Sequence, residues 1–218
     1  RENVRTTRDV LPEEAWEYIN ELYLYTQEYA EKSIGRRNRY QFLENIVLRC
    51  QTILGLISST LQRDHAHRFI KIGHLIERAD MTTRVIDVGI TEVSFDEHHH
   101  STIDPLIWAC MLRSLSAMSA YRRAIGPLVE GSDVVNFVLR DDLFPRSVKF
   151  CLNGIREELA PLKNNKAALG ILDKSRRKVS RFNPEDKTQL ALQAFIDGLQ
   201  LEINTINNTF TSTWFLQE

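Results

Sequence analysis

Apolar side chains recur along this chain at intervals of three and four residues, the period of a helix with one buried face. The clearest run comprises Phe42, Ile46, Cys50, Ile53, Leu56 and Ile57. No stretch of useful length alternates apolar and polar residues as a half-buried strand does. The pattern therefore predicts an all-α protein.

Helix start and stop signals divide the chain into segments joined by short turns. Pro12 followed by two glutamates opens one helix, Asp64 can cap another, and Gly126-Pro127 ends a third. The predicted helices are 12–33, about 42–57, 65–90, 104–125, 133–140, 145–162, 164–179 and 183–214. Residues 91–103 have no period and are predicted to form a loop. We expect a single domain over residues 1–218, a multi-helix bundle of about seven to eight helices.

The first ten residues, RENVRTTRDV, read like the end of a helix. We therefore expect the domain to lack its N-terminal helices and its core to be incomplete. An apolar face without a partner usually marks an interaction surface. Self-association through such a face is accordingly a prediction.

The helix predicted over 65–90 has an unusual distribution of charge. Gly73, Glu77, Asp80, Arg84 and Asp87 follow one another at intervals of four, three, four and three, between two apolar sides. A surface helix normally places its charges opposite a single apolar stripe. We therefore predict that this lane faces a neighbouring helix inside the bundle. The exposed strip would then comprise His67, Lys71, Arg78 and Thr82.

Buried ions need partners, and the helix predicted over 104–125 offers one. Trp108, Leu115 and Arg122 are spaced by sevens and share an apolar face, so we predict that Arg122 reaches Glu77 or Asp80. The cluster has two interpretations, which stay open. It is either an ion network that fixes helix register or a polar site that binds a ligand or cation. Its members are Glu77, Arg78, Asp80 and Arg84.

A second candidate site lies at the helix start predicted at Pro145. Free amide groups there can hold an anion, with Arg146 assisting. The alternative is that Asp142 caps the helix and forms salt bridges with its neighbours.

The charge balance excludes some classes of partner. Lys plus Arg is 28 and Asp plus Glu is 29, so there is no basic excess to attract nucleic acid or an anionic membrane. No apolar run is long enough for a membrane span. The three cysteines form no Cys-x-x-Cys pair, which favours a reducing compartment and predicts a cytoplasmic protein.

Candidate chemistry is sparse. Glu97-His98-His99-His100 offers metal ligands in number, but a loop lacks the preorganisation of a specific site, so we predict no metal. Gly-rich phosphate loops, nucleophile elbows and paired thiols are all absent from the sequence, and we predict no cofactor. No nucleophile has a visible base beside it, so whether the protein is an enzyme stays open.

The segment FIKIGHLIERADMTTRVIDV resembles the hallmark of the alpha-E family, bacterial α-helical domains named for an "ER" motif. The resemblance extends to RENVRTTRDVLPEEAWEYINELY, LIWACMLRSLSAMSAYRRAI and VVNFVLRDDLFPRSVKFCL, in the family's order. It covers roughly the first three quarters of the chain. Chains of this family begin with a further helix that carries a similar ER segment, and this sequence lacks it.

The resemblance implies a function only through genomic association. Alpha-E chains neighbour, or are fused to, circularly permuted ATP-grasp proteins and transglutaminase-like proteins. This association implies an accessory or scaffold protein that works with an ATP-grasp-type amide ligase in peptide synthesis or modification. The alternative is an enzyme component whose polar site inside the bundle acts on a peptide-like substrate. Fold and neighbours alone do not establish a mechanism.

Overall fold

The computed structural model describes residues 1–92, 104–184 and 188–215. Within these ranges the chain folds into α-helices joined by turns and two short 3-10 helices, without a strand, so the predicted all-α class is confirmed. The helices form two compact units, Arg1–His67 and Arg68–Glu218. The loop predicted over 91–103, with its three histidines, falls almost entirely outside the described residues.

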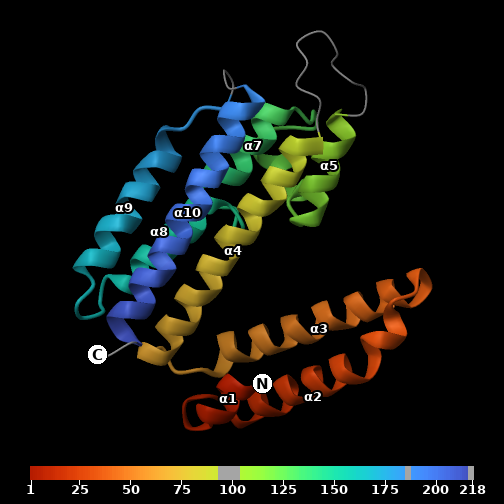
Figure 1. Cartoon of the computed structure of the whole chain (residues 1–218), viewed down its shortest axis with the longest axis vertical. Coiled ribbons are helices and arrows are strands. Elements are labelled where there is room, and N and C mark those ends of the chain that lie inside the picture. The colour runs from red at the N-terminus through yellow and green to blue at the C-terminus, as the bar shows by residue number, and fades with distance from the viewer. Residues whose placement is uncertain (93–103, 185–187, 216–218) are drawn as a thin grey trace. The chain divides into compact units, whose positions relative to one another are not determined.

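The first unit is a helical hairpin. After α1 (Glu2–Thr6), the antiparallel helices α2 (Glu13–Tyr29) and α3 (Arg36–Thr60) pack along their length (Figure 1). Phe42 stacks on Tyr25 with ring centroids 5.7 Å apart, and the Arg49 guanidinium lies over the same tyrosine. Few residues of this hairpin are buried: Ala15, Ser33, Ile53 and Leu61.

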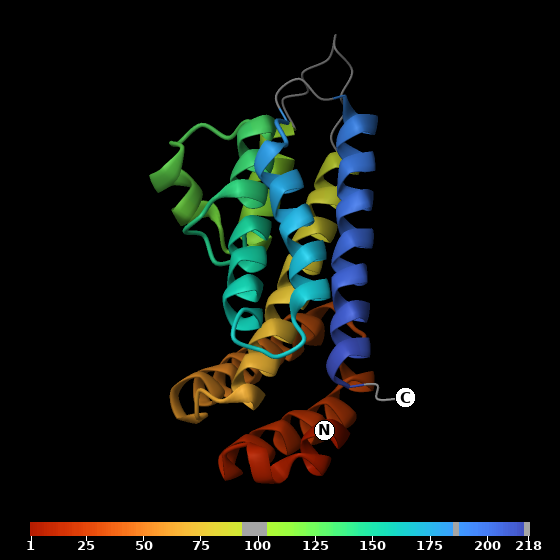
Figure 2. The same cartoon turned by 90° about the vertical axis from the view of Figure 1, so that its left-hand side faces the viewer.

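The second unit is a bundle built on two long helices, α4 (His65–Glu92) and α10 (Gln189–Trp214). Between them in sequence come α5 (Asp104–Ser114), α6 (Met118–Ala124), α7 (Gly131–Arg140), α8 (Val148–Leu159) and α9 (Lys166–Arg181). α8 and α9 form a second hairpin (Figure 2), joined by the ion pair of Arg156 with Asp173 at 3.0 Å. α9 in turn packs against α10. Phe182, directly after α9, stacks on Phe195 of α10.

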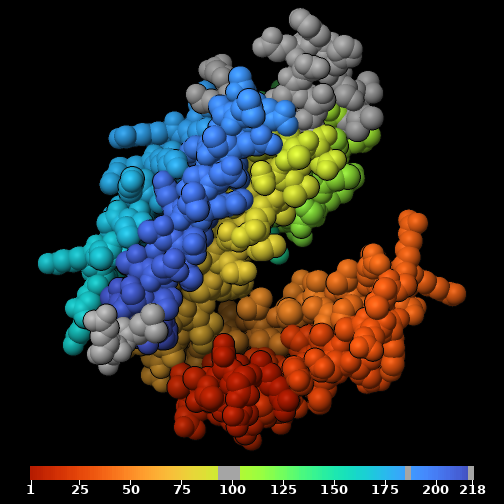
Figure 3. All heavy atoms as spheres, in the orientation of Figure 1, coloured from red at the N-terminus to blue at the C-terminus, as the bar shows by residue number. Residues whose placement is uncertain are grey.

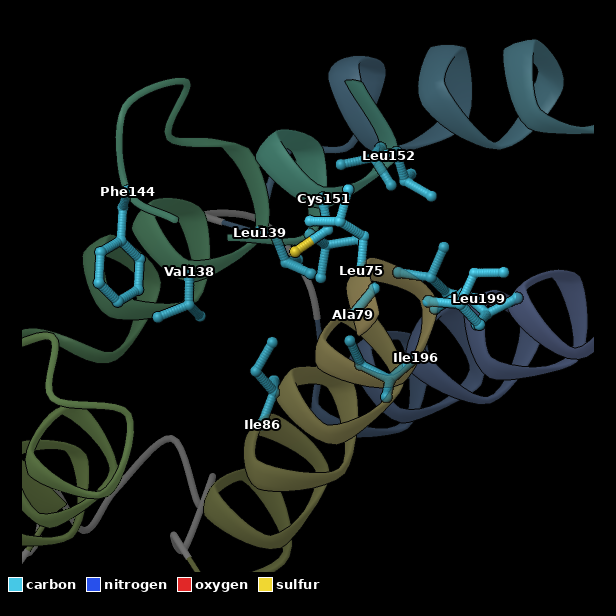
Figure 4. Close-up of a cluster of buried hydrophobic side chains, with 14 of the residues drawn as sticks. Leu75, Ala79, Ile86, Val138, Leu139, Phe144, Cys151, Leu152, Ile196 and Leu199 are labelled. Atoms are coloured by element: carbon cyan, nitrogen blue, oxygen red, sulfur yellow. The ribbon is translucent and has the colours of Figure 1, made fainter. Parts of the chain in front are cut away.

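The core lies at the centre of this bundle. Leu75 and Ala79 from α4, Leu139 from α7, Cys151 from α8 and Leu199 from α10 converge in it (Figure 4). Each helix turns its apolar face to this centre, as the three-and-four periodicity predicted. Burial of these side chains is the main stabilising contribution to the unit.

Two helix starts and the continuity of one helix were predicted wrongly for local reasons. The last helix begins at Gln189, where the Thr188 hydroxyl accepts from the Ala191 amide, and not at Asn183. The helix expected at Pro145 begins at Val148, because Ser147 caps it by accepting from the Phe150 amide at 3.0 Å. The helix expected over 104–125 is broken between α5 and α6, where Ser116 takes a φ of 54°.

Candidate functional site

α4 and α10 run antiparallel and touch near both ends. At one end Phe69 packs edge to face on Phe210, with centroids 5.5 Å apart. At the other, the Gln189 side-chain amide donates to the Ile90 carbonyl at 2.9 Å. The two helices lie side by side on the face shown in Figure 3. Between the two contacts they leave room for side chains that do not enter the core.

This room is an open groove of about 650 Å³. From α4 it is lined by Gly73, Ile76, Glu77, Asp80 and Arg84, and from α10 by Asp197, Gln200, Leu201, Ile203, Asn204 and Asn207. Ile76 and Ile203 are buried in the core below, whereas Glu77, Asp197 and Asn204 are exposed. The groove therefore has an apolar floor and polar walls.

The charges of the groove are only partly neutralised. Asp80 pairs with Arg84 at 2.6 Å, and that arginine side chain remains 59% exposed. Glu77 and Asp197 have no ion pair among the described residues, so the walls carry more negative than positive charge. The carboxylates without an ion pair accept hydrogen bonds, and the side-chain amides both donate and accept them. A polar ligand in the groove would therefore find both kinds of partner.

The predicted lane is thus real, but its predicted burial was wrong. Glu77, Asp80 and Arg84 lie at one face of α4 and beside another helix, yet at the surface of the bundle. The core-facing positions Leu75 and Ala79 turn the opposite side of α4 into the bundle, so the lane stays at the outer edge, where its charges keep water. Gly73 does not bring two helices close together, since no atom lies within 4 Å of a Cβ built there; it widens the groove.

The strip predicted to be exposed is instead partly buried. Thr82 is 1% exposed, and its hydroxyl donates to the Arg146 carbonyl at 2.9 Å. Arg78 donates to the Pro145 carbonyl at 3.2 Å. This side of α4 therefore packs against the segment that precedes α8, a contact between residues more than sixty positions apart that periodicity could not reveal.

His74 is part of the same contact. Its Nε2 lies 3.2 Å from an Arg78 nitrogen, and since a guanidinium can only donate, the imidazole accepts and is neutral. Burial and then the charges of Arg78 and Arg146 lower the pKa of His74 below its usual value of 6.5.

Arg122 does not complete the groove. It is exposed on α6, and no ion pair among the described residues joins it to Glu77 or Asp80. The prediction rested on a seven-residue spacing within one continuous helix, and the break at residues 115–117, where Ser116 takes a positive φ, places Arg122 on a separate helix. The expected pairing was wrong.

The second candidate site also differs from its prediction. Arg146 is exposed, one residue before the cap of α8, and Asp142 pairs with Lys149 at 2.8 Å without capping the helix. Asp141 orders the turn instead, accepting from the amides of Leu143 and Phe144. Ser147 already takes the Phe150 amide, so this helix start offers less to an anion than the sequence indicated.

Neither an activated buried thiol nor a cluster of metal ligands is found in the described part of the chain. Burial raises the pKa of the Cys151 thiol to about 11, which keeps it protonated at neutral pH and poorly nucleophilic. Within residues 1–92, 104–184 and 188–215, no three His, Cys, Asp or Glu side chains gather to hold a metal ion. None of the helices in these ranges is long and apolar enough to cross a membrane.

Glu77-Arg78 is the only Glu-Arg pair in the sequence, and it lies on the groove helix. Residues 1–215 match the Alpha-E family, described as a predicted alpha-helical domain with a conserved ER motif. The chain belongs to the Alpha-E family. No curated protein and no solved structure matches it. The match extends beyond the three quarters in which the sequence resembled the family and includes α10, the second wall of the groove.

The two residues of the ER motif act on different sides of α4. Glu77 stands exposed in the groove, whereas Arg78 ties α4 to the segment before α8. In this Alpha-E domain the arginine thus has a structural contact and the glutamate faces solvent. A motif glutamate that contributes to no described structural contact is a candidate for binding.

The α10 wall is the part of the site that was missed. Asp197, Gln200, Asn204 and Asn207 are spaced by three, four and three, so they form a polar lane on the last predicted helix. That signal was present in the sequence. Nothing in the sequence showed that the polar lane of α10 would lie opposite Glu77.

Proposed function

We propose that this Alpha-E domain is an accessory binding protein for an ATP-grasp-type amide ligase, and that the α4–α10 groove holds a peptide-like chain. The observation that carries the proposal is the position of the motif glutamate Glu77, exposed in a groove whose walls are carboxylates and amides. The ligase partner and a transglutaminase-like partner come from the family resemblance alone.

The groove suits a peptide chemically. Gln200, Asn204 and Asn207 can each donate to a peptide carbonyl and accept from a peptide N–H. Glu77 and Asp197 favour N–H groups or an ammonium, and Ile76 with Leu201 offers apolar contact. Grooves of this kind typically combine apolar lining with a few polar groups that fix orientation.

Binding is favoured over catalysis because the groove holds no nucleophile next to a base in the described residues. The alternative, an enzyme component, requires Glu77 or Asp80 to act as an acid or base on the bound chain. Asp80 is already engaged by Arg84, which leaves Glu77 as the only α4 carboxylate in the groove without an ion pair.

Blocking the groove tests the proposal most directly. Gly73→Leu fills the groove from open space, while Gly170→Leu adds the same side chain at an exposed α9 position that is equally unobstructed. The protein would be combined with an ATP-grasp protein of the class that the family resemblance implies, and ATP consumption and amide formation would be followed. We expect Gly73→Leu to abolish the stimulation by this chain and Gly170→Leu to preserve it. Equal activity of both variants would contradict a role for the groove.

Glu77→Gln distinguishes the two functions. Glu157→Gln, at an exposed position of α8, is the matched control. If the groove binds, Glu77→Gln raises the concentration of protein needed for half-maximal stimulation and leaves the maximal rate nearly unchanged. A lost maximal rate with unaltered binding would favour the enzyme component. A cytoplasmic location belongs to the same proposal and is supported by the exposed free thiol of Cys110.

A further inference from the structure

The hairpin of the first unit leaves a long apolar strip of α3 uncovered. α2 covers the side of α3 that carries Phe42 and Arg49. About a quarter turn away, a second row follows intervals of three, four, three, four and three, which is the a/d spacing of a coiled coil. It comprises Tyr40, Leu43, Val47, Cys50, Leu54 and Ile57, named here the α3 seam.

Four of the six residues of the α3 seam are exposed, and Cys50 and Ile57 are partly buried. Leu43 is 53% exposed and Val47 is 52% exposed, and Tyr40 and Leu54 are exposed as well. α3 has 25 residues, so the seam extends along most of a helix about 37 Å long. Single exposed apolar residues are ordinary, but a continuous row at heptad spacing is the pattern that takes another helix.

We propose that the α3 seam pairs with the α3 seam of a second copy of this chain, with the two helices parallel. A seam on a two-fold axis is self-complementary, so each residue meets its own equivalent. The two hairpins would then form a four-helix assembly, with α2 on the outside of each α3. The proposal concerns the first unit and is independent of the function assigned to the α4–α10 groove.

Charge next to the seam decides the direction. Arg39 and Glu44 flank it on opposite sides, five residues apart. In a parallel pair this spacing brings Arg39 of one copy beside Glu44 of the other, and the two-fold axis repeats the contact. An antiparallel pair would separate these unlike charges. The remaining positions that flank the seam are uncharged, so no other pair opposes the parallel direction: Ile46, Gln51, Ile53 and Ser58.

Seam substitutions test the pairing in the 218-residue chain. Sedimentation velocity at micromolar and at near-millimolar concentration would compare the unaltered chain, Val47→Glu, and the control Leu48→Glu. Leu48 is 55% exposed on the same helix but off the seam, so both variants add one charge at an exposed position. We expect a dimer for the unaltered chain and for Leu48→Glu, and a monomer with an unchanged helical circular dichroism spectrum for Val47→Glu. A monomeric unaltered chain, or equal disruption by both variants, would overturn the proposal.

Cross-linking tests the direction. In a Cys50→Ser, Cys110→Ser background, Tyr40→Cys places a thiol at one end of the seam. Parallel pairing brings the two introduced thiols together, so oxidation should give a disulfide-linked dimer. Antiparallel pairing places each opposite Ile57, about 25 Å from its equivalent. The absence of a cross-linked dimer under conditions where the chain sediments as a dimer would overturn the parallel arrangement.

Discussion

At the scale of single residues, charged groups hold α4 in place at several points along its length. Glu158 of α8 is nearly buried and accepts from Arg68 at 2.9 Å and from Lys71 at 2.6 Å. Farther along, Arg78 and Thr82 hold the same helix to backbone carbonyls before α8. These contacts join residues distant in sequence and fix which face of α4 is turned to the core.

We expect Glu158→Ala to lower the free energy of unfolding by about 1.5–3 kcal/mol, the range for hydrogen bonds to charged groups. The lower part of this range is favoured because the Arg68 and Lys71 side chains are 30% and 44% exposed and can return to water. Urea unfolding followed by circular dichroism measures the change. The neighbouring exposed Glu157→Ala should stay within about 0.5 kcal/mol, and a loss as large as that of Glu158→Ala would show that the ion pairs contribute nothing specific.

The stability of the second unit should fall as the pH is lowered through the titration of His74. Its folded-state pKa lies below the usual value of 6.5, so the unfolded chain binds the proton more readily. The stabilisation by neutral His74 is therefore present above about pH 6.5 and is lost as the pH falls below it. Burial of His74, and then the charges of Arg78 and Arg146, oppose its protonation.

The measurement is urea unfolding at about pH 7.5 and pH 5. His74→Gln should reduce the difference between the two, whereas His65→Gln, at an exposed position, should not. An unchanged difference in His74→Gln would mean that other groups dominate the pH dependence.

At the scale of the elements, close approach of α5 and α7 is set by a glycine. A Cβ at Gly131 would lie 2.7 Å from the indole nitrogen of Trp108, which is itself buried. A rigid ring in a packed core cannot move aside without disturbing its neighbours. The periodicity of α7 predicted a helix. The small size of Gly131, at its first position, decides how near α5 can come.

Gly131→Ala should destabilise the protein by about 1–3 kcal/mol, the usual effect of overpacking. Gly170→Ala, in α9 with open space around it, should stabilise it by about 0.5–1 kcal/mol through helix propensity alone. Thermal unfolding of both variants compares the two effects. If Gly131→Ala were stabilising as well, the contact with Trp108 would be looser than described.

At the scale of the whole molecule, the two units differ in how much apolar surface they bury. The second has a continuous core from α4 to α10, whereas the first buries little beyond Ala15, Ile53 and Leu61. Helices in proteins gain most of their stability from tertiary packing. The hairpin should therefore be the part of lower local stability.

Hydrogen exchange should show this difference directly. We expect amides in α2 and α3 to exchange faster than those in α8 and α9 in dilute protein, because local opening there exposes little apolar surface. If the α3 seam pairs, protection of α3 should rise with protein concentration in the unaltered chain and stay constant in Val47→Glu. Uniform, concentration-independent protection across both units would contradict the unequal stability.

The sequence by itself determined the helical class, most helix positions, the charged lane on α4 and the family, because helical period, caps and motifs are local properties. It also contained the polar lane of α10 and the α3 seam, which follow the same period. Tertiary structure alone decided that the two polar lanes lie opposite each other, that Thr82 is buried while Glu77 is exposed, and that Arg122 is separate from both. Periodicity defines the faces of a helix but not which neighbour each face meets, since that depends on contacts between residues far apart in the chain.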